Sequence, residues 1–383
     1  MGCAGLAQAA PFKPASDADI VERLPGRASD PAIRRVDSLR KQLAAQPDNA
    51  DLRVAIARRY FDMAMAQGDP RYVGYASAAI APLGKIQIPP TGYAMVLGLI
   101  QQFSHDFEPA LASLAAASQQ DPASPDPLLW RSAIFMVQAR YAEAALECQR
   151  LNNLADPLLG LGCSAYVDAS TGKLTQAFEK LSVAVQAASQ TVPELALWQA
   201  TRLAEMAWRL GRFDQAESYF KNALRQGVTD QFLLGAYADF LLARQRPGEV
   251  ITLLADWERS DILLLRLALA GKATGEKRSA DWAAQLRSRF VAAALRGDRL
   301  HEQEAARFEL DIEGNASKAL TLASANYRIQ KEPRDAEILM RAALAARQAK
   351  AAQVALDWLR GSRYEDPALS ALAAQLATQG ATR

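Results

Sequence analysis

The sequence contains few of the residues that build metal sites and disulfide frameworks. Its 383 residues include only three cysteines and two histidines, which are Cys3, Cys148, Cys163, His105 and His301. No two cysteines form a CxxC pair, and the glutamates beside His301 do not stand at the i,i+4 spacing of a helical metal site. Structural zinc sites combine four Cys or His ligands at short spacings. We therefore expect no metal, and we expect His105 to be an ordinary surface residue.

Motifs of the common enzyme classes are also missing. The sequence has no GxSxG, no Gly-rich phosphate loop and no HExxH. Its carboxylates do not form the apolar-flanked pair that general acid–base catalysis requires. These absences predict a protein that is not an enzyme and that holds no cofactor.

Neither a strong net charge nor a long apolar run is present. The 44 Lys and Arg residues nearly balance the 42 Asp and Glu residues, for a formal net charge of +2. Such a balance gives no general field that would attract nucleic acid or an acidic membrane. The most apolar segment, residues 262–270, is interrupted by Arg266 and is shorter than the roughly 20 residues that span a bilayer. We expect neither a nucleic-acid partner nor a membrane span.

The first residues, MGCAGLAQAA, are small and apolar. Ala7-Gln8-Ala9 resembles the small-x-small site that signal peptidase recognises. Residues 1–9 are therefore interpreted either as the remnant of a signal peptide or as a disordered Ala-rich tail, followed by an extended leader over residues 10–30. The first interpretation predicts a periplasmic or secreted protein, and the second leaves a cytoplasmic one open. Lipidation is not expected, because Leu6 stands where N-myristoylation requires Ser or Thr.

What the sequence does contain is a helical repeat. Half of its residues are apolar, and the abundance of Ala and Leu favours helices. Predicted turns between paired helices fall at positions 105, 139, 172, 211 and 245, which differ by 34, 33, 39 and 34. A period near 34 is typical of a helix–turn–helix array. About twenty helices and no strand are expected.

Small residues recur at fixed places in this array, where they allow helices to approach closely. In the first helix of each pair they are Gly98, Ser132, Ala165, Ala204 and Ala238. In the second helix they are Ala110, Ala144, Ala177 and Ala216. Neither helix of a pair can bury its apolar stripe alone, so the pairs must stack.

The segment GRFDQAESYFKNAL, residues 211–224, resembles the second half of a tetratricopeptide repeat, as do residues 105–117, 139–151 and 172–185. The resemblance implies an all-α fold, an α-solenoid in which antiparallel helix pairs form a right-handed superhelix. It is strong over residues 92–256 and fair over 300–360. The predicted organisation is atypical N-terminal helices (31–91), the repeat array (92–256), an irregular helical segment (257–299), and C-terminal units with a cap helix (300–378). The irregular segment is either an atypical repeat or an insertion.

The resemblance also implies a concave groove lined by the first helices. Mapped residue by residue, the predicted protein-binding groove comprises Met95, Leu99, Gln102, Leu129, Met136, Tyr166, Trp198, Thr201, Glu205, Arg209 and Asp239. These positions include no Asn and no Lys, so the mode in which a ladder of Lys, Arg and Asn holds a peptide carboxylate is not expected. An apolar helix or extended segment is the expected ligand. The alternative for Met95, Leu99 and Trp198 is that each belongs to the core.

Cys148 is predicted on a second helix and Cys163 on the next first helix, so the two should be close in space. We favour two buried free thiols, with a disulfide as the alternative for an exported protein.

The leading functional hypothesis is a non-enzymatic scaffold that binds another protein, in envelope assembly or secretion. One alternative is an RNA-binding helical-repeat array, against which the near-neutral charge argues. Another is an enzyme supported by the solenoid, with a site between residues 257 and 312. The sequence leaves the oligomeric state open.

Overall fold

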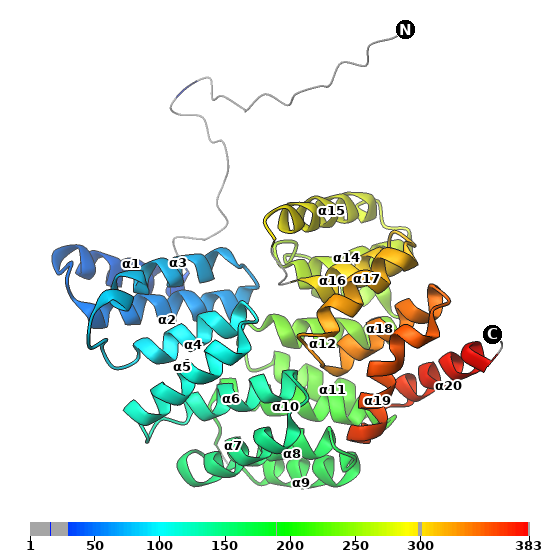
Figure 1. Cartoon of the computed structure of the whole chain (residues 1–383), viewed down its shortest axis with the longest axis horizontal. Coiled ribbons are helices and arrows are strands. Elements are labelled where there is room, and N and C mark those ends of the chain that lie inside the picture. The colour runs from blue at the N-terminus through cyan, green and yellow to red at the C-terminus, as the bar shows by residue number, and fades with distance from the viewer. Residues whose placement is uncertain (1–15, 17–29, 189, 298–300, 382–383) are drawn as a thin grey trace.

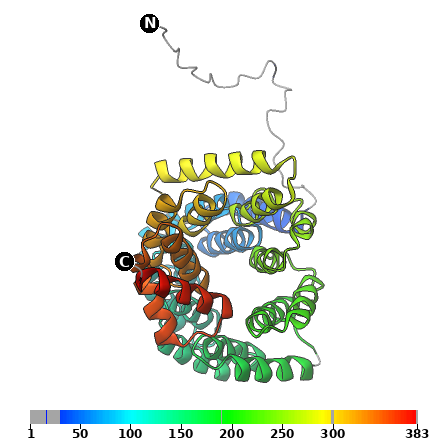
Figure 2. The same ribbon diagram turned by 90° about the vertical axis from the view of Figure 1, so that its right-hand side faces the viewer.

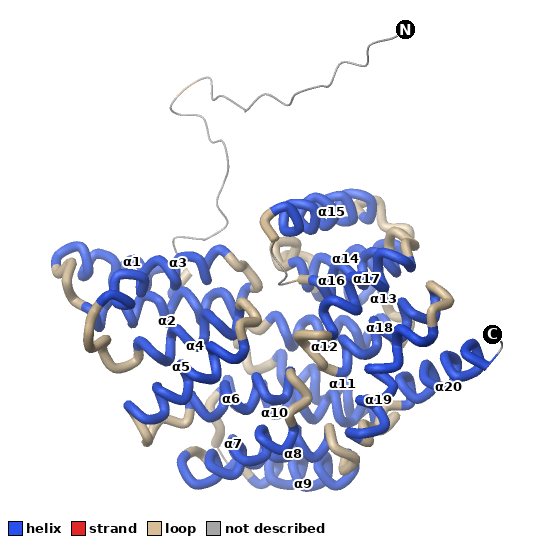
Figure 3. Tube along the Cα trace, in the orientation of Figure 1, coloured by secondary structure: helices blue, strands red, loops and turns tan. Residues whose placement is uncertain are grey.

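The computed structural model describes residues 16, 30–188, 190–297 and 301–381, and within them the chain forms twenty α-helices and two short 3-10 helices, with no strand (Figures 1 and 3). The predicted all-α fold is confirmed. The proposed signal remnant and almost all of the proposed leader lie outside the described residues. In the described ranges, no helix is long and apolar enough to cross a membrane.

The helices form consecutive antiparallel pairs. The N-terminal helices are α1 (Pro31–Ala45), α2 (Ala50–Gln67), α3 (Arg71–Ile80) and the 3-10 helix η1 (Ala81–Lys85). The first six pairs are α4 (Tyr93–Phe103) with α5 (Phe107–Gln120), α6 (Asp126–Val137) with α7 (Tyr141–Leu154), α8 (Pro157–Ala169) with α9 (Leu174–Ala187), α10 (Pro193–Arg209) with α11 (Phe213–Leu224), α12 (Gln231–Ala243) with α13 (Pro247–Leu253), and α14 (Asp261–Thr274) with α15 (Ser279–Leu295). The chain continues with α16 (Glu302–Asp311), α17 (Ala316–Tyr327), α18 (Pro333–Ala345), η2 (Ala349–Ala352), α19 (Gln353–Ser362) and α20 (Pro367–Ala381).

Side-chain caps start the first two helices. The Asp30 carboxylate accepts a hydrogen bond from the Ala32 amide at 2.8 Å, and the Asn49 side-chain oxygen accepts one from the Leu52 amide at 3.0 Å. Each cap satisfies an amide that has no partner inside its helix and contributes on the order of 1 kcal/mol.

The turns within pairs share one backbone conformation. All five predicted turn residues of the array are left-handed, with φ of +60° at His105, +58° at Ala139, +83° at Gly172, +73° at Gly211 and +59° at Gln245. In each turn the following amide bonds back five residues, as in the 2.8 Å bond from the Arg212 amide to the Ala207 carbonyl. This pattern satisfies the last carbonyls of the first helix and reverses the chain. In the pair of α18 and α19, the left-handed turn residue is Arg347 (φ +56°).

Close helix approach at the small residues is confirmed. A β-carbon added at Gly98 would lie 2.8 Å from Leu114 Cγ, a distance that real side chains do not tolerate. Ala110, Ala144 and Ala216 have no exposed surface. The two helices of a pair leave no space between them at these positions, so larger side chains there would overpack the contact.

The described part of the irregular segment, residues 257–297, packs as a further helix pair. α14 contacts α12 on one side and α16 on the other, and α15 packs on α14. The polar stretch from Gly271 continues α14 to Thr274, and Gly275 ends the helix. A β-carbon at Gly271 would lie 3.0 Å from the Trp282 ring, so glycine permits the contact between α14 and α15. The segment therefore acts as an atypical repeat.

The stacked pairs curl until distant parts of the chain meet, as Figure 2 shows from the side. α2 contacts α12, and the Gln231 side-chain amide donates to the Met65 carbonyl at 3.2 Å. Farther along, the connections around α18 and α19 contact the turns that end α4, α6, α8 and α10. The solenoid is therefore closed on itself.

Candidate functional site: the inner face and the seam

Several predicted groove residues belong to the core. Met95 (8% exposed), Leu99 (0%), Met136 (9%) and Thr201 (7%) are buried. The three apolar side chains join one hydrophobic cluster, and the Thr201 hydroxyl donates to the Leu197 carbonyl at 2.8 Å in its own helix. In this closed form these side chains offer a ligand almost no surface, which corresponds to the core alternative for Met95 and Leu99.

Three more predicted groove residues are half-buried on the same side of the array. Gln102 lies at the end of α4, and Leu129 and Trp198 pack against the hydrophobic cluster from α6 and α10. Ile329, from the connection between α17 and α18, packs against this cluster too. The C-terminal part of the chain therefore covers part of the predicted groove.

Tyr166, Arg202 and Glu205 form a contact group on neighbouring first helices. The Arg202 guanidinium carbon lies 4.1 Å from the centroid of the Tyr166 ring, and Arg202 also pairs with Glu205 at 2.8 Å. Burial raises the pKa of Tyr166. The charges that act on its phenol include Glu332 and Arg334, so the start of α18 faces this group.

Arg209 binds the C-terminal part of the chain directly. Its guanidinium carbon lies 3.7 Å from the centroid of the Tyr364 ring. Its Nε donates to the Glu365 carbonyl at 2.9 Å, and a terminal nitrogen donates to the Ala169 carbonyl at 2.6 Å. The Glu365 carboxylate in turn accepts from the Leu174 amide at 2.6 Å. We call the contacts between the C-terminal units and the turns of the array the seam.

The seam extends along successive turns of the array. The Trp358 ring nitrogen donates to the Tyr141 hydroxyl at 2.9 Å, and the Lys331 amide donates to the Val137 carbonyl at 2.7 Å. His105, expected to be a simple surface residue, is half-buried with its Nε2 2.8 Å from the Gln330 side-chain amide nitrogen. The C-terminal units are therefore held by a row of polar and aromatic contacts.

Asp239, the last predicted groove residue, lies in an ion cluster. Its two carboxylate oxygens pair with Arg266 at 2.6 Å and with Arg307 at 2.7 Å. Burial acts to raise the pKa of Asp239, but the two guanidinium charges outweigh it and hold that pKa well below its usual range. These ion pairs connect α12 to α14 and α16. Arg266 is 1% exposed, so Asp239 is held against a buried partner and has little freedom to contact a ligand.

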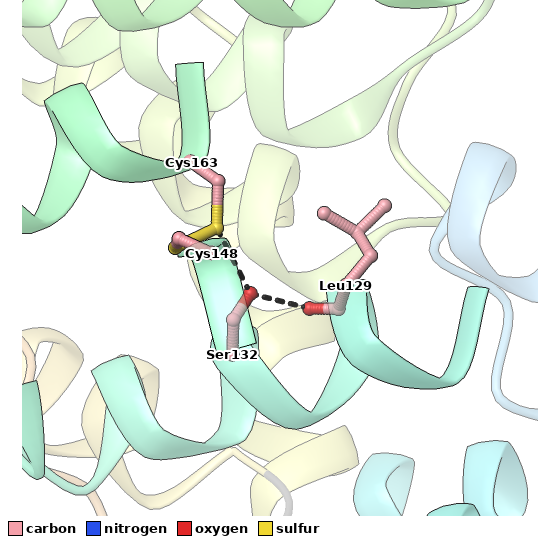
Figure 4. Close-up of a disulfide and its surroundings, with 4 residues drawn as sticks. All are labelled: Leu129, Ser132, Cys148 and Cys163. Atoms are coloured by element: carbon pink, nitrogen blue, oxygen red, sulfur yellow. Dashed lines mark hydrogen bonds between the residues drawn. A yellow bond between two sulfur atoms is a disulfide. The ribbon is translucent and has the colours of Figure 1, made fainter. Parts of the chain in front are cut away.

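A disulfide joins two consecutive pairs of the array. Cys148 on α7 and Cys163 on α8 are buried and bonded through their sulfur atoms, with Ser132 Oγ 3.4 Å from Cys163 Sγ (Figure 4). The predicted proximity of the two residues is confirmed. The preference for free thiols is wrong, because the antiparallel packing of α7 on α8 brings the two Cα atoms to 5.4 Å, a separation typical of disulfides.

Metal ligation has no structural basis in the part of the chain that is described. No group of three or more His, Cys, Asp or Glu side chains there is arranged to hold a metal ion. His301, at the start of α16, has its Nδ1 3.9 Å from a Glu304 carboxylate oxygen.

The sequence reasoning did not find the residues that close the solenoid. Tyr141 begins α7, Trp358 lies within α19, and Tyr364 and Glu365 follow that helix. Their partners across the seam are 155 to 217 positions away. The one available signal was the aromatic–acidic run Tyr364-Glu365-Asp366 between two helices.

Comparisons with known proteins identify no family for this chain. No protein-family model matches the chain, and no curated protein matches it. Among solved structures, a crystal structure of the APC/C hetero-tetramer Cut9–Hcn1 is similar at 14% identity and a TM-score of 0.39, over 81% of this chain and 52% of that one. A structure of Naa15/Naa10 bound to HypK-THB is similar at 12% identity and a TM-score of 0.25, over 91% of this chain and 64% of that one. The chain thus spans about half the length of the first.

The class of the protein follows from its own geometry. Stacked antiparallel helix pairs, a spacing near 34 residues and left-handed turns define an α-solenoid that resembles a tetratricopeptide-repeat array.

Proposed function

We propose that this protein is a non-enzymatic scaffold that binds another protein along the concave side of its solenoid. One observation carries the proposal: the edge of that side already holds polypeptide, namely the chain's own C-terminal units. Arg209 and the first amide of α9 bind a backbone carbonyl, an aromatic ring and a carboxylate there. Groups of this kind recognise protein segments in general.

We further propose that the scaffold works outside the cytoplasm, in the periplasm or after secretion, and that envelope assembly or secretion is its setting. The buried disulfide supports this proposal, because structural disulfides persist in oxidising compartments. The small-x-small motif at the N-terminus supports it as well.

A photo-crosslinking amino acid tests the binding function in the cells that make the protein. It is placed at Gln102, a predicted groove residue, and at Val183, 66% exposed on the second helix α9, as a matched control. We expect a defined protein adduct from position 102, identified by mass spectrometry, and none from position 183. Trp198→Ala should weaken the adduct by about tenfold, as loss of an aromatic anchor does.

An adduct that is unchanged by Trp198→Ala would show that the groove assignment is wrong.

Export is tested separately by acid quenching of intact cells and alkylation of free thiols. We expect Cys148 and Cys163 to remain unalkylated, because both are held in the disulfide. We also expect that added protease can digest the protein once osmotic shock has opened the outer compartment. Free thiols in the same assay would exclude an oxidising compartment.

A further inference from the structure

The connection between α19 and α20 is held like a bound peptide. This connection, residues 363–366 with the sequence RYED, is called the corner below. The Tyr364 ring stacks on the Arg209 guanidinium at 3.7 Å and lies 5.3 Å from the Trp358 ring. The Glu365 carboxylate and carbonyl are bound by the Leu174 amide and by Arg209. Two adjacent residues thus supply an aromatic face, an anion and a backbone acceptor to one site.

The receiving surface is formed by the array alone. We define it as Ala169, Gly172, Leu174 and Arg209, at the point where α8 and α10 end and α9 begins. The Leu174 amide is the first of α9, so it has no partner inside the helix and favours an anion. A second Arg209 nitrogen is anchored on the Ala169 carbonyl, which orients the guanidinium towards the corner. Gly172 permits close approach, since a β-carbon there would lie 3.0 Å from Arg363 Cβ.

The corner belongs to a part of the chain with its own core. Helices α16 to α20 share a hydrophobic cluster that includes Leu339, Leu369 and Leu376, whereas the buried Phe308 of α16 belongs to a cluster of the array. The seam itself consists of hydrogen bonds, one stacked cation and a few aromatic side chains. Small polar interfaces between parts of one chain commonly permit relative motion. The corner can therefore leave its site without unfolding either core.

We propose that the corner is an internal ligand, which occupies a docking site for a partner-protein segment that carries an aromatic residue followed directly by a carboxylate. The inference rests on the proposed function and specifies the chemistry of the partner. Arg209 would stack on the partner's aromatic ring and bind the carbonyl of its acidic residue, and the Leu174 amide would bind its carboxylate. A bound partner displaces the corner, and the solenoid opens along the seam.

The tether weakens any competitor in the wild-type protein. An attached segment acts at an effective concentration in the millimolar range, so a free peptide of equal intrinsic affinity binds far less well. Removal of the Tyr364 and Glu365 side chains should vacate the site and reveal its intrinsic affinity.

The test uses the full chain and a fluorescent synthetic peptide with the sequence of residues 361–367, GSRYEDP. Binding by anisotropy is compared between the wild-type protein and the double variant Tyr364→Ala with Glu365→Ala. We expect the variant to bind at least about tenfold more tightly, because it has lost its internal competitor. Val354→Ala, on the exposed face of α19, serves as the matched control and should bind like the wild type.

Two further changes identify the contacts. Arg209→Ala in the double variant, and separately Tyr→Ala or Glu→Gln in the peptide, should each weaken binding by about tenfold, as loss of a stacked or charge-assisted contact does. Circular dichroism melting curves identify any variant that has lost its fold. Equal peptide affinity for the wild type and a folded double variant would overturn the proposal. A doubled mass in light scattering of a mixture of wild type and variant would also overturn the proposal. It would show that the vacated site binds the corner of a second copy of the chain.

The outcomes separate this inference from the proposed function. If position 102 crosslinks a partner but the folded double variant does not bind the peptide more tightly, the scaffold function stands and the internal ligand is wrong. If the double variant binds the peptide but no partner crosslinks, the docking site is real and the groove assignment is wrong.

Discussion

The array of α4 to α15 and the C-terminal module of α16 to α20 are built from the same kind of helix pair but are stabilised differently at their borders. Within the array, each of two large hydrophobic clusters extends across several neighbouring helix pairs. The module has a cluster of its own. It joins the array through Phe308 of α16, which is buried in an array cluster, and through the Asp239 ion cluster and the seam.

This difference shows how a repeat protein can combine rigidity with a place that opens. In a solenoid, each helix pair stacks its apolar surface on the next pair in the sequence, and the stability gained at these interfaces is additive. A contact between distant repeats must be made by whatever side chains the curvature brings together, and here these are polar and aromatic. The array is therefore expected to be the stable platform, and the module the part that moves.

The largest expected effect is Phe220→Ala in the array. Phe220 is fully buried, with its ring 5.1 Å from that of Tyr237 and 5.6 Å from that of Phe240. Truncation of such a ring costs roughly 3–5 kcal/mol in the free energy of unfolding, which urea denaturation can measure. Leu369→Ala, in the module core, should instead weaken only the transition of the module. A single shared transition for both variants would show that the two regions fold as one unit.

Next in size is Asp239→Ala at the border between the two regions. The substitution leaves the buried Arg266 without its carboxylate, and loss of one partner from a buried ion pair costs roughly 3–5 kcal/mol. Because the folded-state pKa of Asp239 is depressed, its contribution is present above the unfolded value of about 3.9 and is lost as pH falls through the folded value. Wild-type stability should therefore fall in acid more steeply than that of Asp239→Ala, and equal slopes would contradict the assignment.

The disulfide gives the third effect, which should be confined to the array. Cys148 and Cys163 are 15 positions apart, and replacing both by Ala removes a cross-link worth about 3 kcal/mol for a loop of this size. Thermal melts of the double variant should show a less stable array and an unchanged module. Cys3→Ser controls for the loss of a cysteine as such. A melt that is insensitive to reductant would argue against the disulfide.

The smallest effect is expected at the seam, from Tyr141→Phe. It removes the acceptor for the Trp358 ring nitrogen, a loss of about 1 kcal/mol. Burial raises the pKa of Tyr141 to about 12, although the hydrogen bond from Trp358 lowers it. The contribution of Tyr141 is therefore complete below the unfolded value of about 10 and is lost as pH rises from there towards 12. Trp fluorescence should report seam opening over this range in the wild type and a much weaker change in Tyr141→Phe.

Local features of the fold were predictable because short-range rules govern them. Asp30 and Asn49 cap helices, and Gly211 takes the left-handed turn that glycine adopts at little cost. The candidate site was predictable only in outline. Leu99 and Tyr166 were both predicted to line the groove, but Leu99 is fully buried, and its burial depends on how tightly the solenoid curls. Whether the described groove residues contact a ligand stays a prediction.

The sequence alone determined the helix pairs, their spacing near 34 residues and the turns between them, since periodicity and backbone preference act over a few residues. Only the tertiary structure decided that Cys148 bonds to Cys163, that Arg266 is buried beside Asp239, and that Tyr364 covers Arg209. Each of these contacts depends on small rotations between successive pairs. Such rotations accumulate along the solenoid, so no local segment specifies which distant residues will meet.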